Sequence, residues 1–381
     1  MTLQLLSDLY TSCKEQSLFG RYITNSDIEV ILDKYNLISQ VKVEGFSVEN
    51  RPIHSIKIGN GKTKILLWSQ MHGNESTTTK AIFDLLNAFL THIDELQQIL
   101  NTCTLLILPI LNPDGAQMYT RVNANKVDLN RDAQDLSQPE SKVLRECFNR
   151  FQPNYCFNLH GQRTLFGAGN TGNSATLSFL SPSVDSARTV TTTRKVAMAI
   201  IGHINKQLQN DLPNAIGRYD DGFNINCVGD TFQSLGSPTV LYEAGHYKDD
   251  YNREKTREYV FKALFYGINY IAQGLEIDNY EWYFNSPENK KNFFDIIIRN
   301  AKVNSDGDIQ DIAIQFKEVL IDDGITFLPI VEKIENLDGF YGHREIDAEG
   351  KEVLDENKLP LKVANEIDFV VLNFSKILIK V

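Results

Sequence analysis

The sequence predicts an α/β fold, in which helices cover both faces of a sheet, followed by a small all-β domain. From about residue 64 to residue 273, apolar runs of strand length alternate with amphipathic runs of helix length, which is the order that produces layered α/β folds. After Asp278 this pattern gives way to short alternating runs separated by glycine-containing turns, as is typical of all-β domains. We therefore expect a larger domain over residues 1–277 and a smaller one over residues 278–381.

The N-terminal segment is expected to form two helices and a hairpin. Residues 3–16 and 25–36 have helical periodicity, whereas residues 41–48 and 52–58 alternate as paired strands do. The elements expected next are strand 65–68, helix 76–100, strand 103–111, helix 139–151, strand 155–159, strand 175–181, helix 190–208, an irregular stretch 210–237, strand 239–242 and helix 252–273. In the smaller domain they are strands 293–298, 309–316, 325–331, 367–374 and 377–381, with a hairpin turn at 304–308.

Composition excludes several classes of protein. At 42% hydrophobic and 23% charged, the 381-residue chain is typical of a soluble globular protein, and without an 18-residue apolar run we expect no membrane partner. The net charge of −11 argues against a nucleic-acid partner; residues 278–381 alone hold 21 acidic and 12 basic residues. Five scattered cysteines favour reduced thiols, and the N-terminus lacks the features of a secretory leader. We therefore expect a cytoplasmic protein.

The stretch from Lys64 to Glu75, KILLWSQMHGNE, is the centre of the prediction. His72 and Glu75 follow an apolar run of strand character and precede a helix, at the kind of strand end where α/β sheets bind ligands. Imidazole nitrogens and carboxylate oxygens are suitable zinc ligands. Taken alone, the stretch fits an exposed loop as well as it fits a metal site.

Two later strands also end in residues of this type. His160 ends the strand at 155–159, and Glu243 follows the strand at 239–242. Catalytic zinc commonly takes three protein ligands, and two histidines with one glutamate are a known set. His72, Glu75 and His160 supply that set, which leaves Glu243 free to act as a general base on water.

These motifs resemble those of the zinc carboxypeptidase A superfamily, which includes the succinylglutamate desuccinylase and aspartoacylase branch. The family's His-x-x-Glu motif is matched by His72 and Glu75, its later histidine by His160, its Asn-Pro-Asp-Gly turn by residues 112–115 and its base by Glu243. The resemblance covers roughly residues 45–275. It implies a mixed, mostly parallel sheet and a Zn²⁺ cofactor.

The same resemblance implies a substrate-binding set. The Asn130-Arg131 pair matches the family's pair that holds the substrate's terminal carboxylate, and Arg121 matches the arginine that polarises the scissile carbonyl. A guanidinium suits both tasks because it stays charged and can bind a carboxylate through two nitrogens. The alternative is that both arginines are surface salt-bridge partners.

Other positions of the family pattern stay open. Tyr219 is a candidate for a tyrosine that assists the reaction, although its spacing from Glu243 does not settle the match. Residues 227–230 fall where the family builds its side-chain pocket, and an acid there, Asp230, would favour a basic side chain. For His246, a role in supporting Glu243 and plain helix capping are equally good interpretations.

We expect a zinc-dependent metallohydrolase, in first place a carboxypeptidase that cleaves an amide next to a free C-terminal carboxylate. The expected partner is a peptide or acyl-amino-acid substrate. An N-acyl amino acid deacylase or a cell-wall peptide amidase is the alternative. A zinc-bearing binding protein is a third interpretation, but a binder has no need of Glu243, Arg121 and Arg131 together. The oligomeric state is left open.

Overall fold

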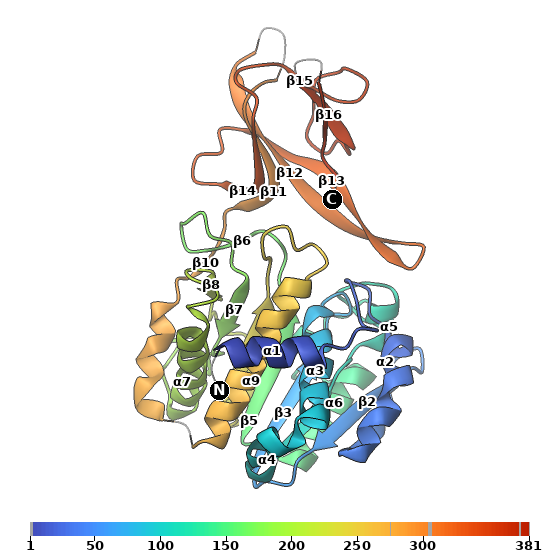
Figure 1. Cartoon of the computed structure of the whole chain (residues 1–381), viewed down its shortest axis with the longest axis vertical. Helices are drawn as coiled ribbons and strands as arrows, with labels where there is room; N and C mark the ends of the chain where they lie inside the picture. The colour runs from blue at the N-terminus through green and yellow to red at the C-terminus, as the bar shows by residue number, and fades with distance from the viewer. Residues whose placement is uncertain (1–2, 275, 304–306, 373–374, 381) are drawn as a thin grey trace.

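The larger domain is built on one eight-stranded mixed sheet, as the computed structural model of the chain shows (Figure 1). The structure describes residues 3–274, 276–303, 307–372 and 375–380. The strand order is β1-β2-β4-β3-β5-β9-β7-β8, and the central strands β4, β3, β5 and β9 run parallel. The strands are β1 Ser39–Phe46, β2 Pro52–Ile58, β3 Thr63–Ser69, β4 Cys103–Leu108, β5 Tyr155–Gly161, β7 Leu177–Leu180, β8 Ile216–Arg218 and β9 Thr239–Ala244.

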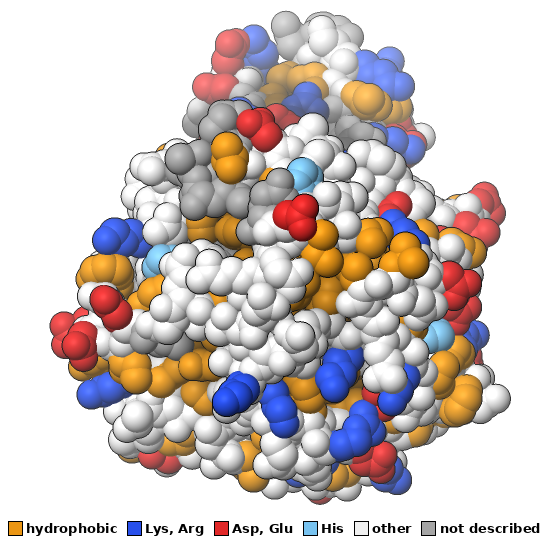
Figure 2. Space-filling view, turned by 60° about the horizontal axis from the view of Figure 1, so that its bottom comes forward, with side chains coloured by type: hydrophobic (Ala, Val, Ile, Leu, Met, Phe, Trp, Pro, Cys, Tyr) orange, Lys and Arg blue, Asp and Glu red, His pale blue; other side chains and the backbone are white. Residues whose placement is uncertain are grey.

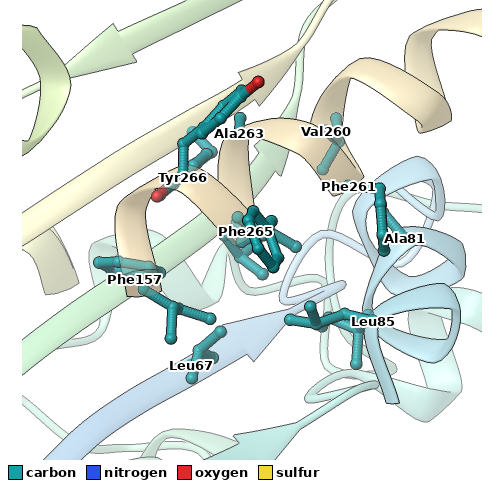
Figure 3. Packing of buried hydrophobic residues seen from close by; sticks show 14 of the residues in the cluster. Leu67, Ala81, Leu85, Phe157, Val260, Phe261, Ala263, Phe265 and Tyr266 are labelled. Carbon is teal, nitrogen blue, oxygen red and sulfur yellow. The ribbon is translucent and has the colours of Figure 1, made fainter. Parts of the chain in front are cut away.

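Helices cover both faces of this sheet because side chains alternate along its strands. Ile65 and Leu67 of β3 enter a core shared with α3 and α9, whereas Leu66 and Trp68 enter a second core with α6 on the other face. Figure 3 shows the first core, in which side chains of α9 meet Leu67 and side chains of α3. The helices are α1 Leu3–Cys13, α2 Asn25–Leu32, α3 Thr77–Thr91, α4 Ile93–Thr102, α5 Pro113–Gln117, α6 Pro139–Phe151, α7 Thr192–Leu208, α8 Val228–Ser234 and α9 Glu254–Ala272, with 3₁₀ turns at Asp33–Leu37, Leu129–Arg131 and Ile277–Asn285.

Most predicted elements are present, and several differ in extent. The helix expected over 76–100 is two helices, α3 and α4, because His92 has non-helical dihedral angles (φ −124°, ψ 41°). The stretch 210–237 is not wholly irregular, since it contains β8 and α8, which are too short to show a period. Residues 112–115 are a turn that opens α5, and Asn112 Oδ1 caps it by accepting a hydrogen bond from Gly115 N at 2.8 Å.

The C-terminal part is all-β, as predicted, and lies at one end of the larger domain in Figure 1. A four-stranded sheet has the order β13-β12-β11-β14, and a three-stranded sheet has the order β15-β16-β17. Its strands are β11 Phe293–Lys302, β12 Ile309–Ile321, β13 Gly324–Glu335, β14 Tyr341–Asp347, β15 Val353–Leu354, β16 Phe369–Leu372 and β17 Ser375–Leu378. Of the hairpin turn expected at 304–308, residues 304–306 lie outside the described residues.

The segment between the two domains lies on the larger one. The 3₁₀ turn Ile277–Asn285 packs against α7, and β10 Asn289–Lys291 pairs with β6 Phe166–Ala168. The boundary at residue 277 concerns independent folding and stays a prediction. Both signs of charge are scattered over the face of the larger domain that points away from the β domain (Figure 2). All five cysteines are free, and in the described residues no helix is both long and apolar enough to cross a bilayer.

Candidate metal centre and substrate cleft

His72, Glu75 and His160 converge at the carboxyl edge of the sheet. His72 Nδ1 lies 2.8 Å from Glu75 Oε1, His160 Nδ1 lies 3.0 Å from Glu75 Oε2, and the two Nδ1 atoms are 3.2 Å apart. The turn after β3 brings the first two together, since Glu75 N donates to His72 O at 3.1 Å. Gly73 is required there, because a Cβ on it would lie 1.9 Å from the carbonyl carbon of Gly115. Within the described parts of the chain, no other His, Cys or acidic group has this geometry.

The chemistry of this group fits a zinc ion. Burial raises the pKa of Glu75, but the two imidazoles outweigh burial and hold it well below its usual range. Burial lowers the pKa of His160, while Glu75 and Asp128 together overcome burial at His72 and raise its pKa. Two ring nitrogens and an ionised carboxylate directed at one point are a zinc donor set, and both rings are almost fully buried.

Asp128 supports this site, and sequence reasoning missed it. Its Oδ1 lies 3.1 Å from His72 Nε2, the ring nitrogen left to donate when Nδ1 faces the other ligands. It also accepts from Asn130 N at 2.9 Å and from Arg121 Nε at 3.1 Å. Burial raises its pKa, but His72 and Arg121 outweigh burial and hold it well below the usual range. A ligand imidazole usually donates its second N–H to such a group, and that rule was the available signal.

Glu243 stands beside the metal group with a free carboxylate oxygen. It lies on β9 directly opposite His160 of β5, and its Oε2 is buried without a hydrogen-bond partner. Burial, reinforced by the charge of Glu75, raises its pKa well above the usual range, while Arg121 opposes the rise. A carboxyl group in this setting can take up a proton and release it again.

Arg121, predicted to be catalytic, and Asn130 and Arg131, predicted to bind substrate, come from the irregular chain between α5 and α6. Arg121 Nη1 reaches to 3.4 Å from Glu75 Oε1, and its side chain is 47% exposed. Asn130 Oδ1 accepts from the backbone N of Val228 at 3.0 Å, which ties this chain to the start of α8. Arg131 Nη1 donates to Asn130 O at 2.7 Å and contacts Cys227 Sγ at 3.2 Å. Both arginines line the metal group's cleft, and Arg121 also forms ion pairs with Glu75 and Asp128.

A single cleft of about 850 Å³ joins these groups. The predicted site residues that line it are His72, Glu75, Arg121, Asn130, Arg131, His160 and Glu243. Tyr219 lines it too, and burial together with Glu243 raises its pKa to about 12. Asp230 and Asn158 form a polar part of the wall: burial raises the pKa of Asp230 to about 6, and both amide atoms of Asn158 are buried without partners. His246 lies away from the cleft, where its ring packs on His343.

The comparison with known proteins decides the family. Residues 24–265 match the zinc carboxypeptidase family, Peptidase_M14. The chain belongs to the zinc carboxypeptidase family. The predicted family, the fold class and the zinc cofactor of that family are therefore confirmed.

The zinc carboxypeptidase relatives are similar over part of their length. Probable carboxypeptidase 2 of Arthroderma benhamiae is 30% identical over 125 residues, which are 33% of this chain and 22% of that protein. Gamma-D-glutamyl-L-diamino acid endopeptidase 1 of Lysinibacillus sphaericus is 31% identical over 101 residues, 24% of this chain and 25% of that protein. This chain thus spans only about a fifth to a quarter of these two relatives.

Solved structures share the carboxypeptidase fold. A metallo-carboxypeptidase from Burkholderia cenocepacia has a TM-score of 0.52 and 18% identity, over 66% of this chain and 69% of that one. At this identity the likeness concerns the fold alone. It agrees with the mixed sheet described above, at whose carboxyl edge the metal group lies.

Proposed function

We propose that this protein is a zinc-dependent metallocarboxypeptidase, which cleaves an amide bond next to a free C-terminal carboxylate. The observation that carries the proposal is one cleft that holds the His72–Glu75–His160 group, the unpartnered carboxylate of Glu243 and the guanidinium of Arg131. Burying a carboxylate without a hydrogen-bond partner costs free energy, and such groups occur mainly at catalytic sites. A protein that only bound its ligand would have no need of this carboxylate beside the metal group.

Zinc, when bound by the three ligands, supplies Lewis acidity at the scissile carbonyl. Arg121, whose Nη1 lies 3.4 Å from Glu75 Oε1, is assigned to the negative charge that develops on the carbonyl oxygen. Glu243 accepts the proton of the attacking water and passes it to the leaving amine. Burial raises the pKa of Glu243, which makes its carboxylate a stronger proton acceptor and keeps the neutral acid in place until the amine takes the proton.

Arg131 and Asn130 are assigned to the substrate's terminal carboxylate. A guanidinium with free nitrogens can hold a carboxylate through two parallel hydrogen bonds. The buried groups of Asp230 and Asn158 are then available to the side chain of the last residue. An acid and an unsatisfied amide favour a side chain that donates hydrogen bonds, so we propose a preference for a basic or amino-bearing residue.

The second candidate is an amidase that acts on cell-wall peptides. Its support is the similarity to the endopeptidase from Lysinibacillus sphaericus, whose name specifies a γ-D-glutamyl–L-diamino acid bond. A diamino acid would offer an amino group to Asp230. A deacylase of N-acyl amino acids would use the same Arg131 contact with a different acyl group.

Paired peptides with a free or an amidated C-terminus test the proposal. We expect the zinc-loaded protein to cleave the free peptide, and both C-terminal amidation and Arg131→Ala to reduce turnover by about ten- to a hundredfold, the value of a charge-assisted hydrogen bond. Glu243→Gln should keep its zinc and lose at least about a hundredfold in activity. Arg150→Ala, an exposed position on α6 outside the cleft, is the matched control. Equal rates on both peptides would favour the amidase.

A further inference from the structure

The β domain forms one wall of the cleft that holds the metal group. Its strand β12 lines the cleft with residues 315–318, and its strand β13 lines it with Phe327, Ile330 and Glu332. The reaction cleft is therefore built from two parts of the chain that are distant in sequence. Substrate bound beside the metal group lies between the larger domain and this wall.

Hydrogen bonds connect this wall of the cleft to the larger domain close to Glu75 and close to His160. Ser76, next to Glu75, donates to the backbone oxygen of Arg21 at 2.5 Å, and Arg21 Nη2 donates to both carboxylate oxygens of Glu318 on β12 at 2.9 Å. On the other side, Thr164 follows His160 by four residues. Its hydroxyl accepts from Gln315 Nε2 at 2.7 Å. These contacts hold β12 in a defined place relative to the metal group.

The wall lies opposite the proposed carboxylate anchor. Arg131 and Asp230 belong to segments that pack with α6, on one face of the sheet, as the burial of Leu129 and Val228 in that core shows. Arg21, which binds Glu318 of the β domain, follows a segment that packs with α3 and α9 on the other face of the sheet. The metal group lies at the sheet edge between the two. A peptide with its terminal carboxylate at Arg131 therefore extends its acyl portion toward the β domain.

Three cations line this acyl side. Arg163 follows β5, Lys291 ends β10 and Lys317 lies on β12, and all three are exposed in the cleft. The side chains of these three residues make no hydrogen bond or ion pair with a residue that the structure describes. We call this set the basic wall. Among nearby acids, Glu318 is engaged by Arg21 and Asp295 by Tyr251 and Gln315, which leaves Glu332 as the opposing free charge.

The basic wall contrasts with the chain as a whole, whose net charge is −11. Arg163, Lys291 and Lys317 come from three separate segments and line the same cleft. Cations that line a cleft raise the local concentration of anionic ligands. We propose that the basic wall is a specificity subsite for the acyl side of the substrate, and that it selects peptides with a carboxylate-bearing residue just before the cleaved bond. This inference rests on the proposed hydrolase function, whose chemistry it does not alter.

Two peptides that differ only in charge test the subsite. They share a basic C-terminal residue and carry either glutamate or glutamine immediately before the cleaved bond. Because each exposed ion pair contributes little, we expect kcat/KM to favour the glutamate peptide by about three- to tenfold at low salt, mainly through KM, and this preference to shrink as ionic strength rises. Cleavage of the glutamine peptide tests the proposed function by itself.

Charge reversal identifies the residues. In Lys317→Glu and in Arg163→Glu the ratio of the two kcat/KM values should fall toward or below one. Lys333→Glu, on β13 but outside the cleft and paired with Glu335, should keep the wild-type ratio. If the wild type shows no preference, or if the preference survives both reversals, the subsite does not exist.

A failure of turnover is kept separate from a failure of the subsite. If neither peptide is cleaved, the proposed function is wrong for these substrates, and binding of both peptides to zinc-loaded Glu243→Gln is measured by calorimetry. Tighter binding of the glutamate peptide, lost in the Lys317→Glu double variant, supports the subsite. Equal binding of both peptides refutes it.

Discussion

Asp128 is predicted to control zinc affinity without touching the metal. Its carboxylate accepts from His72 Nε2 at 3.1 Å, so it fixes the ring that presents Nδ1 to the metal group. Asp128→Asn keeps an oxygen for this bond and for the cap on Asn130 N, but removes the negative charge. A hydrogen bond to a charged group contributes about 1.5–3 kcal/mol and a neutral one about 1 kcal/mol. The difference, about 0.5–2 kcal/mol, corresponds to a roughly two- to thirtyfold weaker zinc affinity.

The assay is competition for zinc between the protein and a coloured chelator at pH 7. Thermal unfolding in excess chelator shows whether the variant keeps its fold. Asp135→Asn is the matched control, because Asp135 is exposed in the same loop region and makes no hydrogen bond or ion pair with a described residue. Its zinc affinity should equal that of the wild type. An unchanged affinity in Asp128→Asn would refute the reasoning, since His72 would then be oriented by packing alone.

Two further predictions concern the contact between the domains. Glu318→Gln should lower the free energy of unfolding by about 1.5–3 kcal/mol in urea, because the bidentate hydrogen bonds from Arg21 lose their charge partner; an unchanged midpoint would mean that the pair contributes nothing. Burial lowers the pKa of His343 from 6.5 to about 4, so between those values the unfolded chain binds a proton that the folded chain does not, and stability falls as the pH falls. That loss amounts to about 2 kcal/mol between pH 7 and pH 5. In chelator-treated protein, His343→Gln should remove this loss of stability. If the stability of the variant and of the wild type depends equally on pH, the loss does not come from His343.

The metal group could be predicted because its residues end strands. His72 and His160 follow buried apolar runs, and Glu243 ends another, so their place at one sheet edge follows from the parallel strand direction. The strand order that makes β3, β5 and β9 neighbours is not visible in the sequence. The resemblance implied only a mixed, mostly parallel sheet, which the structure has; the order of its strands was not predicted.

Other features leave no periodic signal. Asp128 lies in a polar, irregular stretch in which any of several acids could have faced His72. Helix α8 is seven residues long and contains Gly229, so neither length nor propensity marks it. The break at His92 interrupts a run of apolar residues that continues at helical spacing on both sides. In each case tertiary contacts, rather than local preference, decide the structure.

The sequence predicted the all-β character of the C-terminal part but gave no indication of where it contacts the larger domain. The sheet of the β domain covers Tyr251 with Phe316 and Phe327, and its Glu318 is the charge partner of the buried Arg21. An α/β domain without this sheet would expose those rings and leave Arg21 without its partner carboxylate, at a cost that falls on segments adjacent to Glu75 and His160. The structure of this wall of the cleft, and of the segments next to Glu75 and His160, therefore depends on both domains.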